Sequence, residues 1–416
     1  MLNIAMNKKH IIIAFILLGA LLVFNNILHD IYVKMVSTQT SVRTSLNTEQ
    51  LPPQKLFDRT WKIVKKSYFD TDMNEQDWNR WKAHYQGKIK TEEDAYVAIN
   101  TMLASLDDPY SKFMSKKEFT ELNSSIASKI TGIGVNIFSN AGKIMILNVI
   151  DGTPASAADL KSGDIIYAVD KKEVSGMTIS DVAALVRGPE NSTVELTLLR
   201  NDKKINKTIK RKEIKIKTVK SSVDKNIGYI QILSFIGSTT SNEFVEALEK
   251  TDKTDGLIID LRGNPGGLLP NAVFIANLFI PEGKIVSVVG RNGYKQDLNA
   301  QKTNFTIDKP LVVLVDHSSA SASEILSGAL KDYNKAKLVG TTTYGKGMVQ
   351  EVLPLPNETG LNLTIAKYLT PSGTDINKKG IEPDVNVELT LDDLKQNKDS
   401  QLITAKKVLN DMIKSQ

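Results

Sequence analysis

An apolar strand runs directly into a serine-rich turn at 311–324, LVVLVDHSSASASE. Its first five residues, Leu311-Val312-Val313-Leu314-Val315, include no polar side chain. That pattern is typical of a strand buried on both faces of a sheet. The turn at 316–320 follows, and apolar residues at helical spacing predict a helix over 321–333. Ser321 would then lie at the helix N-terminus, where backbone N–H groups are unpaired and the dipole is positive.

The flanking segments continue an alternation of strands and helices. We expect strands at 227–233, 256–261, 309–316 and 337–340, and helices at 241–250 and 271–278. A polar helix is expected over 391–415, packed on the surface. This alternation predicts the α/β class.

Ser321 is compatible with two roles. Serines near a helix start often only cap it. A nucleophile there would gain from the helix dipole, and the N–H of Ala322 could contribute to an oxyanion hole. Lys346, between Gly345 and Gly347, favours the second role, since the chain offers no well-placed histidine. Burial lowers the pKa of a lysine, and its neutral amine can then act as a base. The alternative is a solvated loop lysine.

A glycine-rich segment, Gly263-Asn264-Pro265-Gly266-Gly267, follows the strand expected at 256–261. It lacks the Gly-Lys-Ser/Thr ending of a phosphate-binding loop. Paired glycines at the end of a strand suit a backbone donor near a substrate carbonyl. Asp260 and Arg262 are interpreted as structural supports.

The segment 130–213 is rich in short strands and resembles a PDZ domain. It opens with Gly132-Ile133-Gly134-Val135, which matches the carboxylate-binding loop of that family. Glycines let consecutive N–H groups turn toward one carboxylate, and the next strand can pair with a peptide. The alternative is a β-rich linker domain without a ligand.

The N-terminal part predicts a membrane anchor followed by helices. Lys8, Lys9 and His10 precede an apolar stretch at 11–24, as in a secretory signal. Because no clear cleavage site follows, we expect an uncleaved single-pass anchor in the cell membrane, with an extracytoplasmic body. The absence of cysteine in such a body fits a bacterium that builds few disulfides. A cleaved signal is the alternative. Residues 56–119 read as helical, with a helix start at Thr91-Glu92-Glu93-Asp94.

Composition excludes several classes of function. The chain of 416 residues has no cysteine, which rules out disulfides and thiol catalysis, and no cluster of metal ligands is visible. The net charge is +6, and the basic run at 208–217 is interpreted as the solvated face of a strand pair. We therefore expect no nucleic-acid partner, no metal and no cofactor.

Several motifs, in order along the chain, resemble the carboxyl-terminal processing peptidases, a serine–lysine family with a PDZ domain. They are Leu106-Asp107-Asp108-Pro109-Tyr110-Ser111, the PDZ-like segment, Asp260-Leu261-Arg262-Gly263-Asn264-Pro265-Gly266-Gly267, Ser319-Ala320-Ser321-Ala322-Ser323-Glu324 and Tyr344-Gly345-Lys346-Gly347-Met348-Val349-Gln350. The resemblance implies an α/β, crotonase-like protease core, an inserted PDZ-like domain and an N-terminal helical region. The expected domains are an anchor (1–36), a linker (37–55), the helical region (56–120), the PDZ-like domain (130–213), the protease core (214–390) and a C-terminal helix (391–416).

The resemblance also implies roles for individual residues. Ser321 would be the nucleophile, Lys346 the general base and Gln350 the residue that positions the lysine. The oxyanion hole would combine the N–H of Ala322 with that of Gly266 or Gly267. Peptide binding would involve Gly132, Ile133, Gly134 and Val135, with Arg187 contacting either a peptide carboxylate or the core.

The implied partners are protein or peptide substrates with free, apolar C-termini, and the membrane through the anchor. The oligomeric state is open, with a homodimer as one candidate. The rival interpretation is a PDZ scaffold whose protease-like core only binds.

Overall fold

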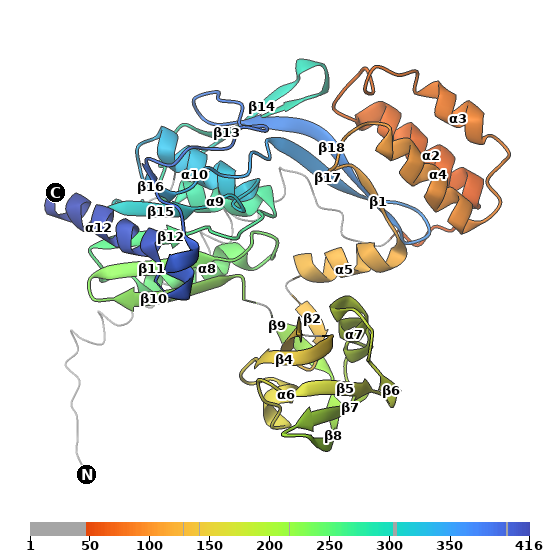
Figure 1. Ribbon diagram of the computed structural model, residues 1–416. Coiled ribbons are helices and arrows are strands. Elements are labelled where there is room, and N and C mark those ends of the chain that lie inside the picture. The colour runs from red at the N-terminus through yellow and green to blue at the C-terminus, as the bar shows by residue number, and fades with distance from the viewer. Residues whose placement is uncertain (1–46, 128, 141, 216, 303–305, 397) are drawn as a thin grey trace, which may run out of the picture. The chain divides into compact units, whose positions relative to one another are not determined.

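The computed structural model describes residues 47–127, 129–140, 142–215, 217–302, 306–396 and 398–416 (Figure 1). The anchor expected over 1–36 lies outside these residues. Within them, no helix combines the length and apolar character needed to cross a bilayer. The chain divides into two compact units. The larger comprises the residues up to Thr120 with Thr218–Ile236 and Thr240–Gln416, and the smaller comprises Glu121–Lys217 with Gly237–Thr239.

A six-stranded sheet of order β10-β11-β12-β15-β16-β19 forms the core of the larger unit. Its strands are β10 (Val219–Asp224), β11 (Ile227–Ile232), β12 (Gly256–Asp260), β15 (Leu311–Val315), β16 (Lys337–Gly340) and β19 (Val385–Asn386). β10 pairs antiparallel with β11, and every later pair is parallel. The predicted α/β class is therefore confirmed.

Helices cover both faces of this sheet (Figure 1). One face packs against α8 (Thr240–Lys250), α9 (Leu269–Asn277) and α10 (Ala322–Asp332), and the other against α12 (Ser400–Lys414). The side chains of β15 alternate between the two cores: Leu311, Val313 and Val315 face the first, and Val312 and Leu314 the second. Each such side chain stabilises the fold by about 1.5–3 kcal/mol when buried, which explains why the strand carries no polar residue.

The single surface helix expected over 391–415 is wrong in two respects. It is divided into α11 (Leu391–Lys395) and α12, and Asp399 caps α12 by accepting a hydrogen bond from the N–H of Leu402 at 2.9 Å. Ala405 and Leu409 of α12 are fully buried against the sheet. The polar composition of the segment concealed an apolar stripe at helical spacing.

A second sheet, of order β1-β18-β13-β14 with β17 paired to β18, belongs to the same unit. It contains β1 (Lys112–Met114), β13 (Lys284–Gly290), β14 (Lys295–Asn299), β17 (Met348–Pro354) and β18 (Gly360–Leu369), and the 3₁₀ turn Arg291–Gly293 joins β13 to β14. The N-terminal helices are α2 (Pro53–Ser67), α3 (Asn79–Tyr85) and α4 (Glu92–Ala104), and they share a hydrophobic cluster with Leu361 and Leu363 of β18. Thr91 caps α4 as predicted, accepting from the N–H of Asp94 at 3.1 Å.

The smaller unit is β-rich, as the sequence predicts. Its main sheet has the order β3-β4-β5-β7-β8, with β6 on β5, and β2 pairs with β9. The elements are β2 (Lys129–Gly132), β3 (Val135–Asn140), β4 (Lys143–Val149), α6 (Pro154–Ala157), β5 (Ile165–Val169), β6 (Lys172–Glu173), α7 (Ile179–Val186), β7 (Thr193–Arg200), β8 (Lys203–Lys210) and β9 (Lys212–Lys215). Asn201 and Asp202, with φ of 51° and 58°, form the predicted hairpin turn between β7 and β8. α5 (Lys116–Ile126) spans the division between the units.

Candidate active site

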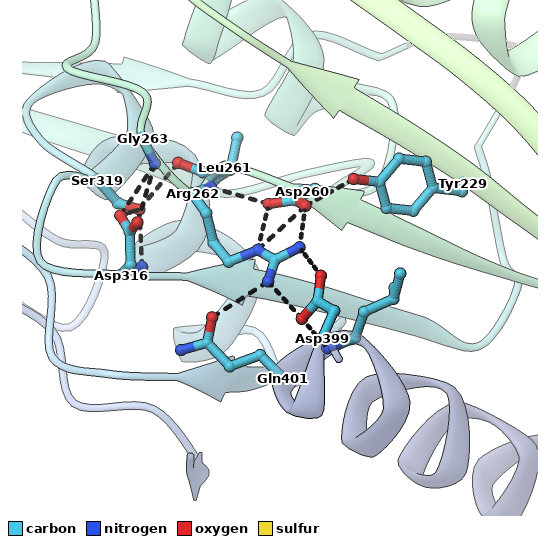
Figure 2. Close-up of polar contacts among 10 residues, drawn as sticks. Tyr229, Asp260, Leu261, Arg262, Gly263, Asp316, Ser319, Asp399 and Gln401 are labelled. Atoms are coloured by element: carbon cyan, nitrogen blue, oxygen red, sulfur yellow. Dashed lines mark hydrogen bonds and ion pairs between the residues drawn. The ribbon is translucent and has the colours of Figure 1, made fainter. Parts of the chain in front are cut away.

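Two loops meet at the carboxyl ends of the neighbouring parallel strands β12 and β15 (Figure 2). The carboxylate of Asp316, in the turn after β15, accepts the N–H of Gly263 at 3.0 and 3.1 Å. The N–H of Ala320 donates to the carbonyl oxygen of Asn264 at 3.0 Å. The serine turn and the glycine loop are thereby fixed to each other.

Ser321 immediately precedes α10 and holds an unusual backbone conformation, with φ 55° and ψ −112°. Such strain costs of order 1–3 kcal/mol and is concentrated at functional sites. Gly266 packs closely on this turn, because a Cβ at Gly266 would lie 2.6 Å from the carbonyl oxygen of Ala320 and 2.9 Å from the nitrogen of Ala322. Ser321 thus lies at the helix start, where the sequence predicts it, in a strained backbone conformation.

The other serines of the cluster have structural partners. Their hydroxyls donate to backbone carbonyl oxygens: Ser319 to Leu261 at 2.9 Å, Ser323 to Asn264 at 3.0 Å and Ser327 to Ser323 at 2.8 Å. Ser318 is exposed, and its N–H donates to Asp316 at 3.0 Å. In the described part of the chain, the hydroxyl of Ser321 donates no bond of this kind to a backbone carbonyl.

Lys346 lies in a loop held by its two flanking glycines. A Cβ on Gly345 would lie 2.9 Å from the nitrogen of Gly380, and one on Gly347 would lie 2.8 Å from the Cβ of Asn377. Burial lowers the pKa of the Lys346 ammonium, although the charges of Asp108 and Glu324 oppose that shift. A lower pKa leaves more of the neutral amine at a given pH, as a general base requires.

Glu324, to which the sequence analysis assigned no role, connects the two candidate catalytic residues. Its fully buried carboxylate accepts the N–H of Ser321 at 2.8 Å, of Gly345 at 2.7 Å and of Lys346 at 2.9 Å, and the hydroxyl of Thr343 at 2.6 Å. One side chain therefore fixes the backbone at both Ser321 and Lys346. A signal was present, since Ser321-x-x-Glu324 has the spacing of a capping box.

Tyr368 of β18 adds a second link. Its hydroxyl lies 3.2 Å from the carbonyl oxygen of Ser321 and also hydrogen-bonds to the carbonyl of Lys346. Burial, and next the charge of Glu324, raises the pKa of Tyr368, so the hydroxyl keeps its proton and remains a donor.

The glycine loop distinguishes the two candidate oxyanion donors. The N–H of Gly266 donates to Oδ1 of Asn264 at 2.9 Å, and Nδ2 of Asn264 donates to the carbonyl of Ile232 at 2.7 Å. The N–H groups of Gly267 and Ala322 have no acceptor among the described residues. Gly267, with φ 145°, also approaches Ile236 too closely for any side chain. The geometry favours Gly267 over Gly266, and sequence spacing could not distinguish them.

The side chains of the proposed dyad share no hydrogen bond in the part of the chain that the structure describes. Within the described residues, no hydrogen bond joins Nζ of Lys346 to Oγ of Ser321 or to Gln350. Nζ of Lys346 instead lies 4.8 Å from the centroid of the Tyr110 ring. Gln350, on β17, donates from Nε2 to Oγ1 of Thr364 at 3.4 Å. Its role in positioning the lysine stays a prediction.

Asp260 and Arg262 form an ion-pair network that attaches α12 to the end of β12 (Figure 2). Arg262 contacts Asp260 at 2.7 Å and Asp399 at 2.8 Å, and its guanidinium also donates to Gln401 at 3.1 Å. The hydroxyl of Tyr229 donates to Asp260 at 2.7 Å. Burial disfavours the charge of Arg262, but its bonds to Asp260 and Asp399 outweigh that effect and raise its pKa. The network has the character of a structural support.

The predicted peptide-binding residues lie together at one edge of the smaller unit. Gly132 ends β2, Val135 begins β3, and β3 is the first strand of its sheet, with α7 packed against it. Gly134 has φ 89° and leaves no room for a Cβ beside Thr153. Arg187 follows α7 and is exposed.

No group of three or more His, Asp or Glu side chains in the described ranges could hold an ion. The carboxylates nearest the serine turn, Asp316 and Glu324, are occupied by N–H and O–H donors.

Family models match three regions of the chain. The model described as Peptidase family S41 matches residues 226–387, a PDZ domain matches 145–200, and the Tricorn protease C1 domain matches 52–103. The PDZ match begins after Gly132–Val135, so the interpretation of that loop depends on its own geometry.

Individual relatives cover most of the chain. A carboxyl-terminal-processing protease of Synechocystis sp. is 36% identical over 350 residues, which span 81% of this chain and 82% of the relative. The carboxy-terminal processing protease CtpA of Bacillus subtilis is 42% identical over 307 residues, 72% of this chain and 66% of the relative. Among solved structures, the photosystem II D1 C-terminal processing protease aligns with a TM-score of 0.55 and 32% identity, covering 81% of this chain and 93% of that one.

Proposed function

Because the chain belongs to peptidase family S41 and is a carboxyl-terminal processing serine protease, we propose that Ser321 and Lys346 carry out the cleavage. The observation that carries this proposal is the shared carboxylate of Glu324. It accepts the N–H of Ser321 and the N–H of Lys346, at 2.8 and 2.9 Å, so the strained serine and the half-buried lysine belong to one constellation.

The proposed reaction is an acyl transfer to serine followed by hydrolysis. The neutral amine of Lys346 takes the proton of Ser321 Oγ, and Oγ attacks the carbonyl carbon of the scissile bond. The resulting oxyanion accepts hydrogen bonds from the N–H groups of Ala322 and Gly267. The ammonium of Lys346 then gives its proton to the leaving amine, and water repeats the steps on the acyl-enzyme. Gln350 would hold the amine once Lys346 turns toward Ser321.

Substrate capture is assigned to the smaller unit. β3 is the first strand of its sheet among the described residues and could pair with an extended peptide, and the backbone at 132–135 can receive the terminal carboxylate. Free, apolar C-termini are the proposed ligands, with Arg187 as a further contact.

We also propose that the apolar stretch at 11–24 tethers the protease to the membrane with its body outside the cytoplasm. The tether is tested by extracting membranes with alkaline carbonate, which should leave the full chain in the membrane fraction. Whether the protein is a homodimer is tested separately by measuring the molar mass of the purified protein by light scattering.

Hydrolysis of a peptide with an apolar C-terminus tests the dyad. We expect Ser321→Ala and Lys346→Ala each to lower kcat by about 10³-fold or more. Ser318→Ala is the matched control, because it keeps the N–H that binds Asp316 and should retain activity. Equal turnover by Lys346→Ala and the wild type would eliminate the lysine as base, and turnover by Ser321→Ala would eliminate the serine. A chain that binds the peptide without any turnover would instead support the scaffold.

A further inference from the structure

We propose that Tyr110 and the turn around it form a resting seat for the Lys346 ammonium, in which Nζ makes no hydrogen bond to Ser321 among the described residues, and that the lysine leaves this seat when it becomes the base. The inference rests on the proposed role of Lys346 and adds a positioning residue from the N-terminal region. It begins from the 4.8 Å separation between Nζ and the centroid of the Tyr110 ring. An ammonium at that distance from an aromatic face is attracted by the ring, whereas a neutral amine is not.

The seat is a fixed part of the fold. Asp108 accepts the N–H of Tyr110 at 3.0 Å and the hydroxyl of Ser111 at 2.6 Å. From β18, Asn362 donates to the carbonyl of Tyr110 at 2.9 Å, and the N–H of Thr364 donates to Oγ of Ser111 at 3.0 Å. Burial, and next the neighbouring Tyr344, raises the pKa of Tyr110, so the ring keeps its hydroxyl proton.

The backbone of Lys346 is fixed as well. Its N–H donates to Glu324 at 2.9 Å, its carbonyl accepts from Tyr368, and Gly347 packs on Asn377. Movement of the amine between the ring and Ser321 therefore requires only rotation of the lysine side chain. Such rotations are fast compared with turnover. The seat therefore determines what fraction of Lys346 lies against the ring, and it does not limit the rate of the reaction.

The charges around Lys346 explain why the seat holds the protonated form. Asp108, from the turn before β1, and Glu324, from α10, favour the ammonium, whereas burial and Lys112 of β1 disfavour it. The face of the Tyr110 ring also favours the ammonium form of Lys346. Losing the proton removes the attraction to the ring and frees the amine to approach Ser321.

Replacing the ring separates this proposal from a purely structural role. In Ser321→Ala, which has no turnover to complicate the assay, the rate of acetylation of Lys346 by acetic anhydride is followed by mass spectrometry across pH. Its midpoint reports the pKa of Lys346 without any measurement of activity. We expect Tyr110→Leu to lower the midpoint by about half a unit to one unit, and Tyr110→Phe to keep it near that of the parent. Tyr96→Leu removes a ring that packs on Phe113 and is the matched control.

In the chain with Ser321 intact, the acid limb of kcat/KM should move to lower pH together with that midpoint. At pH values on this acid limb, kcat/KM of Tyr110→Leu should be roughly 3 to 10 times that of the wild type. A pKa lower by half a unit to one unit increases the fraction of neutral amine by that factor. An unchanged midpoint in Tyr110→Leu would overturn the seat. A uniform loss of activity with an unmoved limb would overturn it also, and would assign the ring to substrate binding. If Lys346→Ala were active, the hypothesis that Lys346 is the general base would be wrong. The acetylation experiment would still decide separately whether Tyr110 binds the Lys346 ammonium.

Discussion

Two buried carboxylates in the larger unit are satisfied by different sets of donors. Asp260, at the end of β12, is paired with the guanidinium of Arg262 and the hydroxyl of Tyr229. Glu324, in α10, is fully buried and accepts three backbone N–H groups and one hydroxyl, and within the described residues no arginine or lysine pairs with it. The first arrangement joins side chains of separate elements, whereas the second fixes the backbone at particular points.

That difference corresponds to two tasks. An arginine bridges elements well, because its planar fork reaches several acceptors at once, and here it connects β12 to α12 through Asp399. At Glu324 a guanidinium would take the acceptor positions that now hold Ser321 and Lys346. We infer that the ion pair attaches a helix, and that the N–H cluster sets the geometry of the reacting residues.

Glu324→Ala should have the largest effect. It leaves three N–H groups and the Thr343 hydroxyl buried without an acceptor, each of which costs about 1–3 kcal/mol. We expect the free energy of unfolding in urea to fall by about 5 kcal/mol, and kcat of the remaining folded protein to fall by roughly 100-fold. Glu249→Ala, on an exposed position of α8, is the control. A stable variant with normal kcat would show that Glu324 does not position the site.

Arg262→Met should come second, with a loss of about 3 kcal/mol, because it leaves Asp260 buried without its cation. Hydrogen exchange should rise first in α12, which loses the bond to Asp399. The double variant Asp260→Asn/Arg262→Met should recover part of the loss. A double variant as unstable as the sum of the two single ones would indicate that the residues are not coupled.

Lys346→Met should stabilise the protein by about 1 kcal/mol, since catalytic groups are commonly held at a cost in stability. The lysine has a lowered pKa in the folded state, so the unfolded chain binds more protons and the penalty is full below the folded pKa. The penalty disappears as pH rises toward the ordinary value of 10.5. Urea unfolding across pH should therefore give a smaller gain at alkaline pH, and a constant gain would contradict the assignment.

Asp399→Asn should have the smallest effect, about 0.5–1 kcal/mol, because the aspartate is partly exposed and screened by solvent. Burial raises the pKa of Asp399, but the bond to Arg262 and the N–H of Leu402 outweigh it and lower the pKa. Its contribution is present above 3.8 and is lost as pH falls through the folded value. Thermal unfolding of the variant and the parent should therefore converge in acid.

Much of the fold could be predicted because its signals are local. The uninterrupted apolar run of β15, the cap at Thr91 and the turn at Asn201-Asp202 each depend on a few adjacent residues. The division of the C-terminal segment into α11 and α12 was missed, since a polar composition concealed which side chains meet the sheet. Ser321 and Lys346 were candidates for the same reason, as unusual residues in glycine- and serine-rich turns.

The surroundings of the site could not be predicted, because they depend on contacts between distant segments. Nothing adjacent to Asn264 indicates that its side chain takes the N–H of Gly266, and nothing adjacent to Tyr110 indicates that its ring faces Lys346. Glu324 is the exception, since the capping-box spacing predicts one of its four bonds.

The dispersion of the site along the chain has a consequence for biosynthesis. The N–H of Thr364 donates to Ser111 across a separation of 253 residues, and Tyr368 of β18 bonds the carbonyl groups of both Ser321 and Lys346. Contacts of this range form late in folding, because the entropy of closing long loops opposes them. During synthesis the N-terminal part emerges first, before the segments that contain Ser321 and Lys346 have been made. Cleavage should therefore begin only when the chain is finished and folded, so the order of assembly itself restrains the protease while it is being made.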